Sequence, residues 1–209
     1  MFKFPEDEEL RRIANLQVTN KELDAFKRIS LSEHSKYNLD LPDTIETVLD
    51  LGCGLGRASI CLNAMLPNEN PKFYLADFNQ VNTTIKYGWN PHDSVYNSLD
   101  KTALFCETNG LTDFETIDLA EQSLDHLENL DVIMSFLSVG FHYPVEPYLD
   151  VFEKILSDDG ILMLGLRAET YGGKYNHYSF ADRFDMVSFD VGYVDLTKER
   201  VLVLKKKSS

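Results

Sequence analysis

The sequence is poor in cysteine and has no long apolar run. Its three cysteines, Cys53, Cys61 and Cys106, are an odd number without C-x-x-C spacing, which argues against a disulfide framework or zinc site. The five histidines show no repeated metal-ligand spacing, so we expect no metal. No apolar run approaches the roughly 18 residues that span a membrane, and the start of the chain is acidic where a signal peptide is apolar. We expect a cytoplasmic protein that binds no membrane.

Positive charge is also scarce. The chain has 20 basic against 34 acidic residues and a net charge of -14, which repels duplex DNA or RNA. The basic run Lys205–Lys207 is typical of a solvated tail, so we expect no nucleic-acid partner. With 209 residues, 44% of them hydrophobic, the chain fits a single domain over 1–209. We expect an N-terminal helical segment (1–43) that caps an α/β core (44–209).

Strand and helix patterns alternate along most of the chain. Apolar residues at helical spacing predict one or two helices over 6–30. Further on, the patterns predict strands over 44–51, 72–76, 114–117, 131–136 and 161–166, helices over 57–66, 98–109 and 146–156, and a turn at 158–160. This alternation predicts a mostly parallel sheet with helices on both faces. Two final strand-like runs, 186–191 and 200–204, leave no room for a helix between them, so they predict a hairpin and a reversed last strand.

A glycine-rich run follows the first predicted strand. In an open parallel sheet, ligands bind beyond the carboxyl ends of the strands, and Gly52, Gly54 and Gly56 would let the backbone approach a ligand closely there. The spacing G-x-G-x-G differs from the dinucleotide pattern G-x-G-x-x-G in its third glycine. Asp50, which closes the strand, suits a ligand with an ammonium group better than one with a pyrophosphate.

The run Val48–Arg57 resembles the first motif of the class I S-adenosylmethionine-dependent methyltransferases, acid-x-G-x-G-x-G. The resemblance extends over residues 45–204. It implies a Rossmann-like, doubly wound, seven-stranded sheet with a reversed C-terminal strand. It also implies S-adenosyl-L-methionine as cofactor and S-adenosyl-L-homocysteine as product.

The same resemblance assigns cofactor roles to residues at the strand ends. Asp77, about 20 residues beyond the glycines, matches the acid that binds the ribose hydroxyls, Asp50 the acid that orients the methionine moiety, and Asp118 the acid near the adenine amino group. The full set of expected cofactor-binding residues is Asp50, Gly52, Cys53, Gly54, Gly56, Asp77, Phe78, Asp118, Leu119 and Ser135.

The expected acceptor site is formed by two polar and aromatic segments. In these enzymes the loop after the fourth strand, here 135–144, closes over the sulfonium and the acceptor, and here it lacks the N-P-P-Y-type motif of many amino-methylating nucleic-acid enzymes. His142 is the candidate catalytic base, since an imidazole titrates near neutral pH; a purely structural histidine is the open alternative. The segment 167–178 is either an acceptor lid or an ordinary loop. The expected substrate-binding residues are Ser138, His142, Tyr143, Arg167, Tyr175 and His177.

These features favour methyl transfer to a small-molecule acceptor, with a hydroxyl of a sugar or related metabolite favoured over an amine. If the acceptor is anionic, Arg167 and Lys174 are its natural partners. Two alternatives stay open. One is a nicotinamide-dependent (NAD) oxidoreductase, which the third glycine and Asp50 disfavour. The other is a module that binds S-adenosylmethionine without catalysis.

Overall fold

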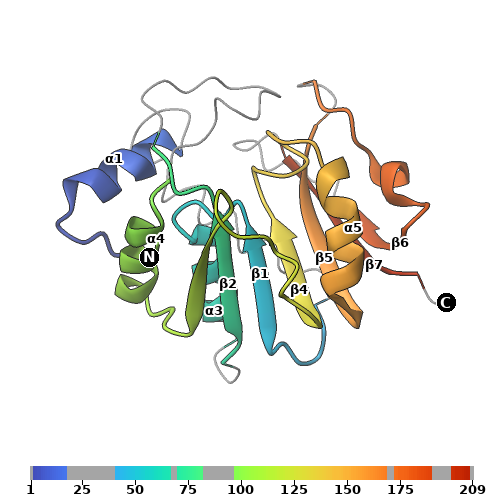
Figure 1. The fold of residues 1–209 in the computed structure, drawn as a ribbon, viewed down its shortest axis with the longest axis horizontal. Helices are drawn as coiled ribbons and strands as arrows, with labels where there is room; N and C mark the ends of the chain where they lie inside the picture. Colours follow the sequence, from blue (N-terminus) through green and yellow to red (C-terminus); the bar gives the residue numbers. More distant parts are fainter. Residues whose placement is uncertain are drawn as a thin grey trace.

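The computed structural model describes residues 2–17, 41–66, 70–81, 97–168, 172–189 and 199–207. These residues contain a seven-stranded sheet in the order β3-β2-β1-β4-β5-β7-β6 (Figure 1). Neighbouring strands from β3 to β5 run parallel, whereas β7 is antiparallel to both β5 and β6. The predicted parallel sheet with a reversed last strand is therefore confirmed. In chain order the strands are β1 (Thr47–Leu51), β2 (Lys72–Asp77), β3 (Phe114–Asp118), β4 (Leu130–Ser135), β5 (Leu156–Arg167), β6 (Phe184–Phe189) and β7 (Glu199–Lys206).

Helices cover both faces of the sheet, as predicted. Successive strand residues point to opposite faces, so Val48 and Leu49 of β1 enter two different apolar clusters. The cluster around Val48 includes residues of α1 (Glu8–Leu16), α3 (Arg57–Met65) and α4 (Leu99–Thr108). The cluster around Leu49 includes residues of α5 (Leu149–Ile155) and of the 3-10 helix η3 (His177–Phe180). Figure 1 shows α5 in front of β5 and beside β4.

The helix predicted within 6–30 begins at Glu8 and is described as far as Leu16; residues 18–40 lie outside the described ranges. Its start follows from capping, because the Asp7 carboxylate accepts a hydrogen bond from the Leu10 amide at 2.7 Å. The same carboxylate lies 2.8 Å from Nζ of Lys101 on α4. The acidic start of the chain thus fastens α1 to the helix beside it.

One boundary prediction was wrong. The structure has no turn at 158–160, because β5 begins at Leu156 and runs through Asp158 and Gly160. The ladder with β4 shifts register at this point, with Leu130 opposite Leu156 and Val132 opposite Ile161. Gly160 fits this irregularity because a Cβ there would lie 2.7 Å from the Leu130 carbonyl oxygen.

The predicted helix over 146–156 consists of two elements. The 3-10 helix η1 (Glu146–Tyr148) leads directly into α5.

Within the described ranges, no helix is long and apolar enough to cross a membrane. The same residues contain no group of three or more histidines, cysteines or acids arranged to hold a metal ion.

Candidate functional site

The glycine loop after β1 is anchored to the end of β2 through its backbone. The amides of Gly52 and Cys53 donate to the Ala76 carbonyl at 2.7 and 3.2 Å. Gly52, Gly54 and Gly56 all have left-handed backbone angles, with φ of 73°, 55° and 73°, which L side chains rarely adopt. A Cβ at Gly52 would also overlap the hydroxyl of Ser138. Glycine at position 52 is therefore required by both conformation and space.

Asp77, the predicted ribose-binding acid, lies at the edge of this loop. Its carboxylate accepts hydrogen bonds from the Gly54 amide at 2.8 Å, the Phe78 amide at 2.8 Å and the Asn97 side-chain amide at 3.1 Å. Burial raises the pKa of Asp77 to about 6 even though these three donors favour the charged form. The residue is half-buried, so its carboxylate is desolvated yet still within reach of a ligand.

Two further residues hold the loop, and sequence reasoning missed both. Asn97 donates from Nδ2 and Thr102 from Oγ1 to the Gly54 carbonyl, each at 2.7 Å. Both side chains are buried, and they bond to one another at 3.2 Å. They lie 43 and 48 residues from Gly54 in the chain, and no local sequence pattern marks such a contact.

Asp50 lies beneath the glycine loop, 2% exposed, and accepts a 2.7 Å hydrogen bond from the Ser59 hydroxyl on α3. Its negative charge adds to burial in raising the pKa of the neighbouring thiols Cys53 and Cys106. All three cysteines are buried and unbonded to one another. The thiols of Cys53 and Cys106 are therefore protonated at neutral pH, and Asp50 supplies the charge under the loop.

Gln17, at the end of α1, reaches the other side of the glycine loop. Its Oε1 accepts from the Leu55 amide at 3.4 Å, and the side chain occupies space that a Cβ at Gly54 would need. Its Nε2 is buried without a hydrogen-bond partner among the described residues. This donor, which sequence reasoning did not single out, lies next to the loop that a ligand would meet.

Asp118 ends β3 next to the Asp77 edge, and Leu119 follows it. Asp77 and Asp118 are opposite each other in the β2–β3 ladder, and the Leu119 amide donates to the Asp77 carbonyl at 3.0 Å. Oδ1 of Asp118 accepts from the Ala120 amide at 3.0 Å. The predicted acids of two strands are thus brought together at one edge.

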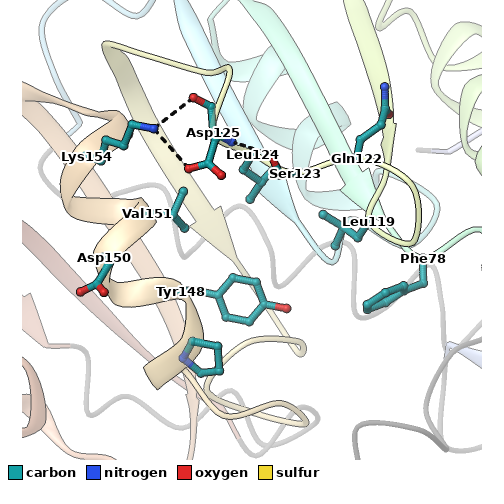
Figure 2. Close-up of a pocket in the computed structure, with 11 residues that line it drawn as sticks. Phe78, Leu119, Gln122, Ser123, Leu124, Asp125, Tyr148, Asp150, Val151 and Lys154 are labelled. Atoms are coloured by element: carbon teal, nitrogen blue, oxygen red, sulfur yellow. Dashed lines mark hydrogen bonds and ion pairs between the residues drawn. The ribbon is translucent and has the colours of Figure 1, made fainter.

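A groove of about 420 Å³ opens beside this edge, with Phe78 and Leu119 in its lining. Figure 2 shows the Tyr148 ring pointing from η1 across the groove toward these two side chains. Burial and the Asp77 charge raise the pKa of Tyr148. The rest of the lining includes polar residues such as Gln122 and Lys154, so the groove offers an apolar side, near the end of β2, that suits a flat, heteroaromatic group.

The loop after β4 is fixed to β1 and to the reversed strand. The Ser135 hydroxyl donates to the Leu51 carbonyl at 2.7 Å and accepts from the Val139 amide at 3.0 Å. Leu137 has a left-handed φ of 54°, and its amide donates to Oε1 of Glu199 at 2.6 Å. Glu199, which sequence reasoning missed, is 5% exposed and begins β7.

Gly165 of β5 makes this contact possible. A side chain at that position would overlap the Glu199 carboxylate, which crosses the face of β5 to reach the loop. The short charge-assisted bond holds Leu137 in a conformation that non-glycine residues rarely adopt. Ser138, the next residue, is the one that fills the space over Gly52. The reversed strand is thereby linked through the loop to the glycine run.

His142 and Tyr143 lie on a tight turn in the same loop. The Ser138 carbonyl accepts from the His142 amide at 2.7 Å and from the Tyr143 amide at 3.1 Å. His142 is 8% exposed and packs edge-on against Phe141, with ring centroids 4.9 Å apart. Burial, with the Asp77 charge, raises the pKa of Tyr143 to about 12. Tyr143 therefore stays protonated at neutral pH.

The remaining predicted substrate residues divide into two groups. Arg167 joins the loop: its amide donates to the Gly140 carbonyl at 3.2 Å, and its guanidinium carbon lies 5.5 Å from the Phe141 ring. Tyr175 instead bonds through its hydroxyl to Glu146 and to the Val145 amide. His177 packs against Phe189 of the edge strand β6, at 5.4 Å between ring centroids. Of the segment 167–178, expected to be either an acceptor lid or an ordinary loop, residues 169–171 lie outside the described ranges.

No protein-family model and no curated protein matches the sequence. The structure is similar to that of precorrin-6y C5,15-methyltransferase from Geobacter metallireducens GS-15, with 16% identity, a TM-score of 0.51, and coverage of 99% of this chain and 95% of that chain. For the mitomycin 7-O-methyltransferase MmcR the identity is 14%, the TM-score 0.58, and the coverage 90% of this chain and 57% of that chain. For an rRNA methylase from Streptococcus thermophilus the identity is 16%, the TM-score 0.50, and the coverage 86% of this chain and 96% of that chain.

At these identities the likeness shows the fold. The sheet order, the reversed β7 and the similar structures together establish that the chain has the class I S-adenosylmethionine-dependent methyltransferase fold. The three similar proteins differ in what their names say they methylate, so the acceptor has to be argued from the site itself.

Proposed function

We propose that this protein transfers a methyl group from S-adenosylmethionine to a small-molecule acceptor, with a hydroxyl of a sugar or related metabolite favoured over an amine. The observation that carries the proposal is the Asp77 carboxylate, desolvated at the sheet edge and bonded to the Gly54 amide at 2.8 Å. It joins the glycine loop to the end of the second strand, where this fold class receives the ribose of its ligand.

The residues present fit this cofactor. Asp77 would accept hydrogen bonds from the ribose hydroxyls, and Phe78 and Leu119 would contact the adenine from the groove wall. The buried charge of Asp50 favours a cationic ammonium group above the glycine loop, because Coulomb attraction is strong in a partly desolvated site. When bound, the cofactor supplies a methyl group already activated by a positively charged sulfur.

The acceptor side would contribute alignment and proton removal. Ser138, His142 and Tyr143 belong to one turn, in which the Ser138 carbonyl accepts from the other two amides, so the turn presents its side chains from a fixed backbone. His142 is mostly buried and would take the proton from an acceptor hydroxyl as the methyl group is transferred. Tyr143 stays protonated and would donate a hydrogen bond.

Charge favours a small molecule over nucleic acid as the acceptor. A net charge of -14 over 209 residues repels a phosphate backbone, whose binding requires clustered lysine and arginine. Because a structurally similar protein is named as an rRNA methylase, RNA is included as an arm of the test.

The test is release of S-adenosylhomocysteine, measured against sugars, nucleotide sugars, hydroxylated carboxylates, phosphorylated amines and RNA. We expect release that depends on one small-molecule class and is lost in Asp77→Ala. Turnover of RNA alone would contradict the proposal that the acceptor is a small molecule. Binding of S-adenosylmethionine without turnover of any acceptor would favour a non-catalytic module, and preferential binding of NAD would favour an oxidoreductase.

A further inference from the structure

Arg167 differs from several basic residues of this acidic protein in having no acidic partner. Lys72, Lys101, Lys154 and Lys174 each lie 2.8 to 3.2 Å from a carboxylate. The guanidinium of Arg167 makes no hydrogen bond or ion pair with any described residue, and its Nε is buried. Because a buried donor without an acceptor costs free energy, an unpaired guanidinium on the acceptor side of the site points to a ligand.

The position of Arg167 is fixed by the acceptor-side loop. Its backbone amide bonds to Gly140, and its guanidinium lies over the Phe141 ring, next to His142. A stacked guanidinium keeps its planar set of donors in one orientation. The arginine and the candidate base His142 therefore contact the same ring, that of Phe141, in this turn.

The nearest acid in the strand register does not neutralise it. Glu199 is opposite Arg167 in the β5–β7 ladder, but its Oε1 accepts from the Leu137 amide and the side chain crosses Gly165. No ion pair joins Glu199 to Arg167 among the described residues. Lys174, the other cation considered for an anionic acceptor, is paired with Glu146 at 3.1 Å.

We propose that the acceptor carries a carboxylate or phosphate group and that Arg167 binds it. Resting on the proposed methyl transfer, this assignment names the acceptor class: a hydroxylated acid or phosphate ester whose anion lies on Arg167 while its hydroxyl faces His142. Planar guanidinium donors bind either anion in a bidentate manner. A neutral sugar would leave the buried Nε unsatisfied.

Arg200 offers a matched control. It lies one residue beyond Glu199, and its Nε is likewise buried without a partner among the described residues. Its guanidinium carbon is 5.9 Å from the ring of Phe189 on the edge strand β6, a different aromatic partner from the Phe141 ring that Arg167 contacts. Arg167→Gln and Arg200→Gln therefore remove the same charge in two different surroundings.

The first arm measures binding without activity, by thermal shift with S-adenosylhomocysteine present and with inorganic phosphate, acetate or chloride at equal ionic strength. We expect phosphate or acetate to stabilise the wild-type protein and Arg200→Gln more than chloride does, and Arg167→Gln no more than chloride does. The anion that stabilises the protein, phosphate or acetate, identifies which acidic group the acceptor carries. Equal responses of the wild-type protein and Arg167→Gln, or no response in any variant, would overturn the assignment.

The second arm measures turnover of matched acceptors, each acid or phosphate ester beside its neutral methyl ester or amide. For the anionic acceptor, Arg167→Gln should raise KM about 10- to 100-fold, the loss expected for a charge-assisted pair, with Arg200→Gln near wild type. Equal use of charged and neutral acceptors would overturn the proposal. Absence of any turnover would count against the proposed function, while the anion-binding arm would still decide the role of Arg167.

Discussion

The two halves of the sheet edge are built differently. At the ends of β1, β2 and β3, the site consists of left-handed glycines and of backbone amides bonded to a carbonyl or a carboxylate, at 2.7 to 2.8 Å around Gly52, Gly54 and Asp77. At the ends of β4 and β5 and the start of β7, it consists of side chains: Glu199 holds the loop, and the Arg167 guanidinium lies over the Phe141 ring of that loop. In the proposed function, the first half would bind the cofactor mainly through its backbone, whereas the second would select the acceptor through a few side chains.

The largest expected effect comes from a substitution in the glycine loop, in the half of the site that is built from backbone. Gly52→Ala places a Cβ on Ser138 at a φ of 73°, so we expect a loss of about 2–5 kcal/mol in unfolding free energy and loss of S-adenosylmethionine binding. Gly110→Ala is the control, because Gly110 has a φ of 86° and a Cβ there would meet no described atom within 4 Å; only the backbone cost of about 1–2 kcal/mol applies. Chemical denaturation measures both. Equal losses would show that contact with Ser138 does not matter.

The next effect concerns the side-chain half and its chemistry. His142→Ala should leave cofactor affinity near wild type and slow turnover about 100-fold, the lower end for loss of a general base. His126, exposed and bonded through Nδ1 to the Ser123 carbonyl, provides the control in His126→Ala. Single-turnover kinetics on the identified acceptor separates the steps. Normal turnover in His142→Ala would leave this histidine with a structural role only.

A smaller effect tests the link between the halves. Glu199→Ala removes the acceptor for the Leu137 amide, so we expect about 10-fold slower turnover and faster hydrogen exchange at that amide. Glu199→Gln keeps an oxygen acceptor in place, so it should partly restore both the turnover rate and the protection of the Leu137 amide from exchange. Val203→Ala, a buried truncation on the same face of β7, should lower stability without changing exchange at Leu137. If Val203→Ala has the same effect, the carboxylate does not position the loop.

A further effect is a pH dependence from Asp77. Its pKa is raised from 3.8 to about 6 in the folded protein, so the unfolded chain loses this proton at lower pH than the folded one. Its contribution to the unfolding free energy therefore falls as pH rises from about 4 to about 6 and is constant outside that window. Denaturation curves of the wild-type protein and Asp77→Asn should differ in slope within this window. Parallel curves would contradict the raised pKa.

The features that could be predicted from the sequence are those that local patterns specify. The parallel sheet and the reversed β7 follow from the alternation of patterns and the short final connection, which are local features. The acids Asp77 and Asp118 were predicted at strand ends, and parallel pairing brings them opposite each other. Their roles toward a cofactor stay predictions.

The rest depends on contacts between distant segments. Glu199 bonds to Leu137, which is 62 residues away in the sequence, and Asn97 bonds to Gly54, which is 43 residues away. Single buried polar residues give no periodic signal in the sequence. Likewise, the turn expected at 158–160 was wrong, because β5 runs through these residues while its ladder with β4 shifts register between Leu156 and Ile161. The bond of the Tyr175 hydroxyl to Glu146 is another tertiary contact without a local signal, and the role of Tyr175 toward an acceptor stays a prediction.

The central claim is that the glycine loop and Asp77 form a site for S-adenosylmethionine. Calorimetric titration of the wild-type protein and Asp77→Asn with S-adenosylmethionine, and with NAD for comparison, tests it most directly. We expect one S-adenosylmethionine per wild-type chain, an affinity lower by about 5- to 150-fold in the variant, equivalent to about 1–3 kcal/mol, and weaker binding of NAD. Equal S-adenosylmethionine affinity in both proteins, or tighter binding of NAD, would contradict the claim.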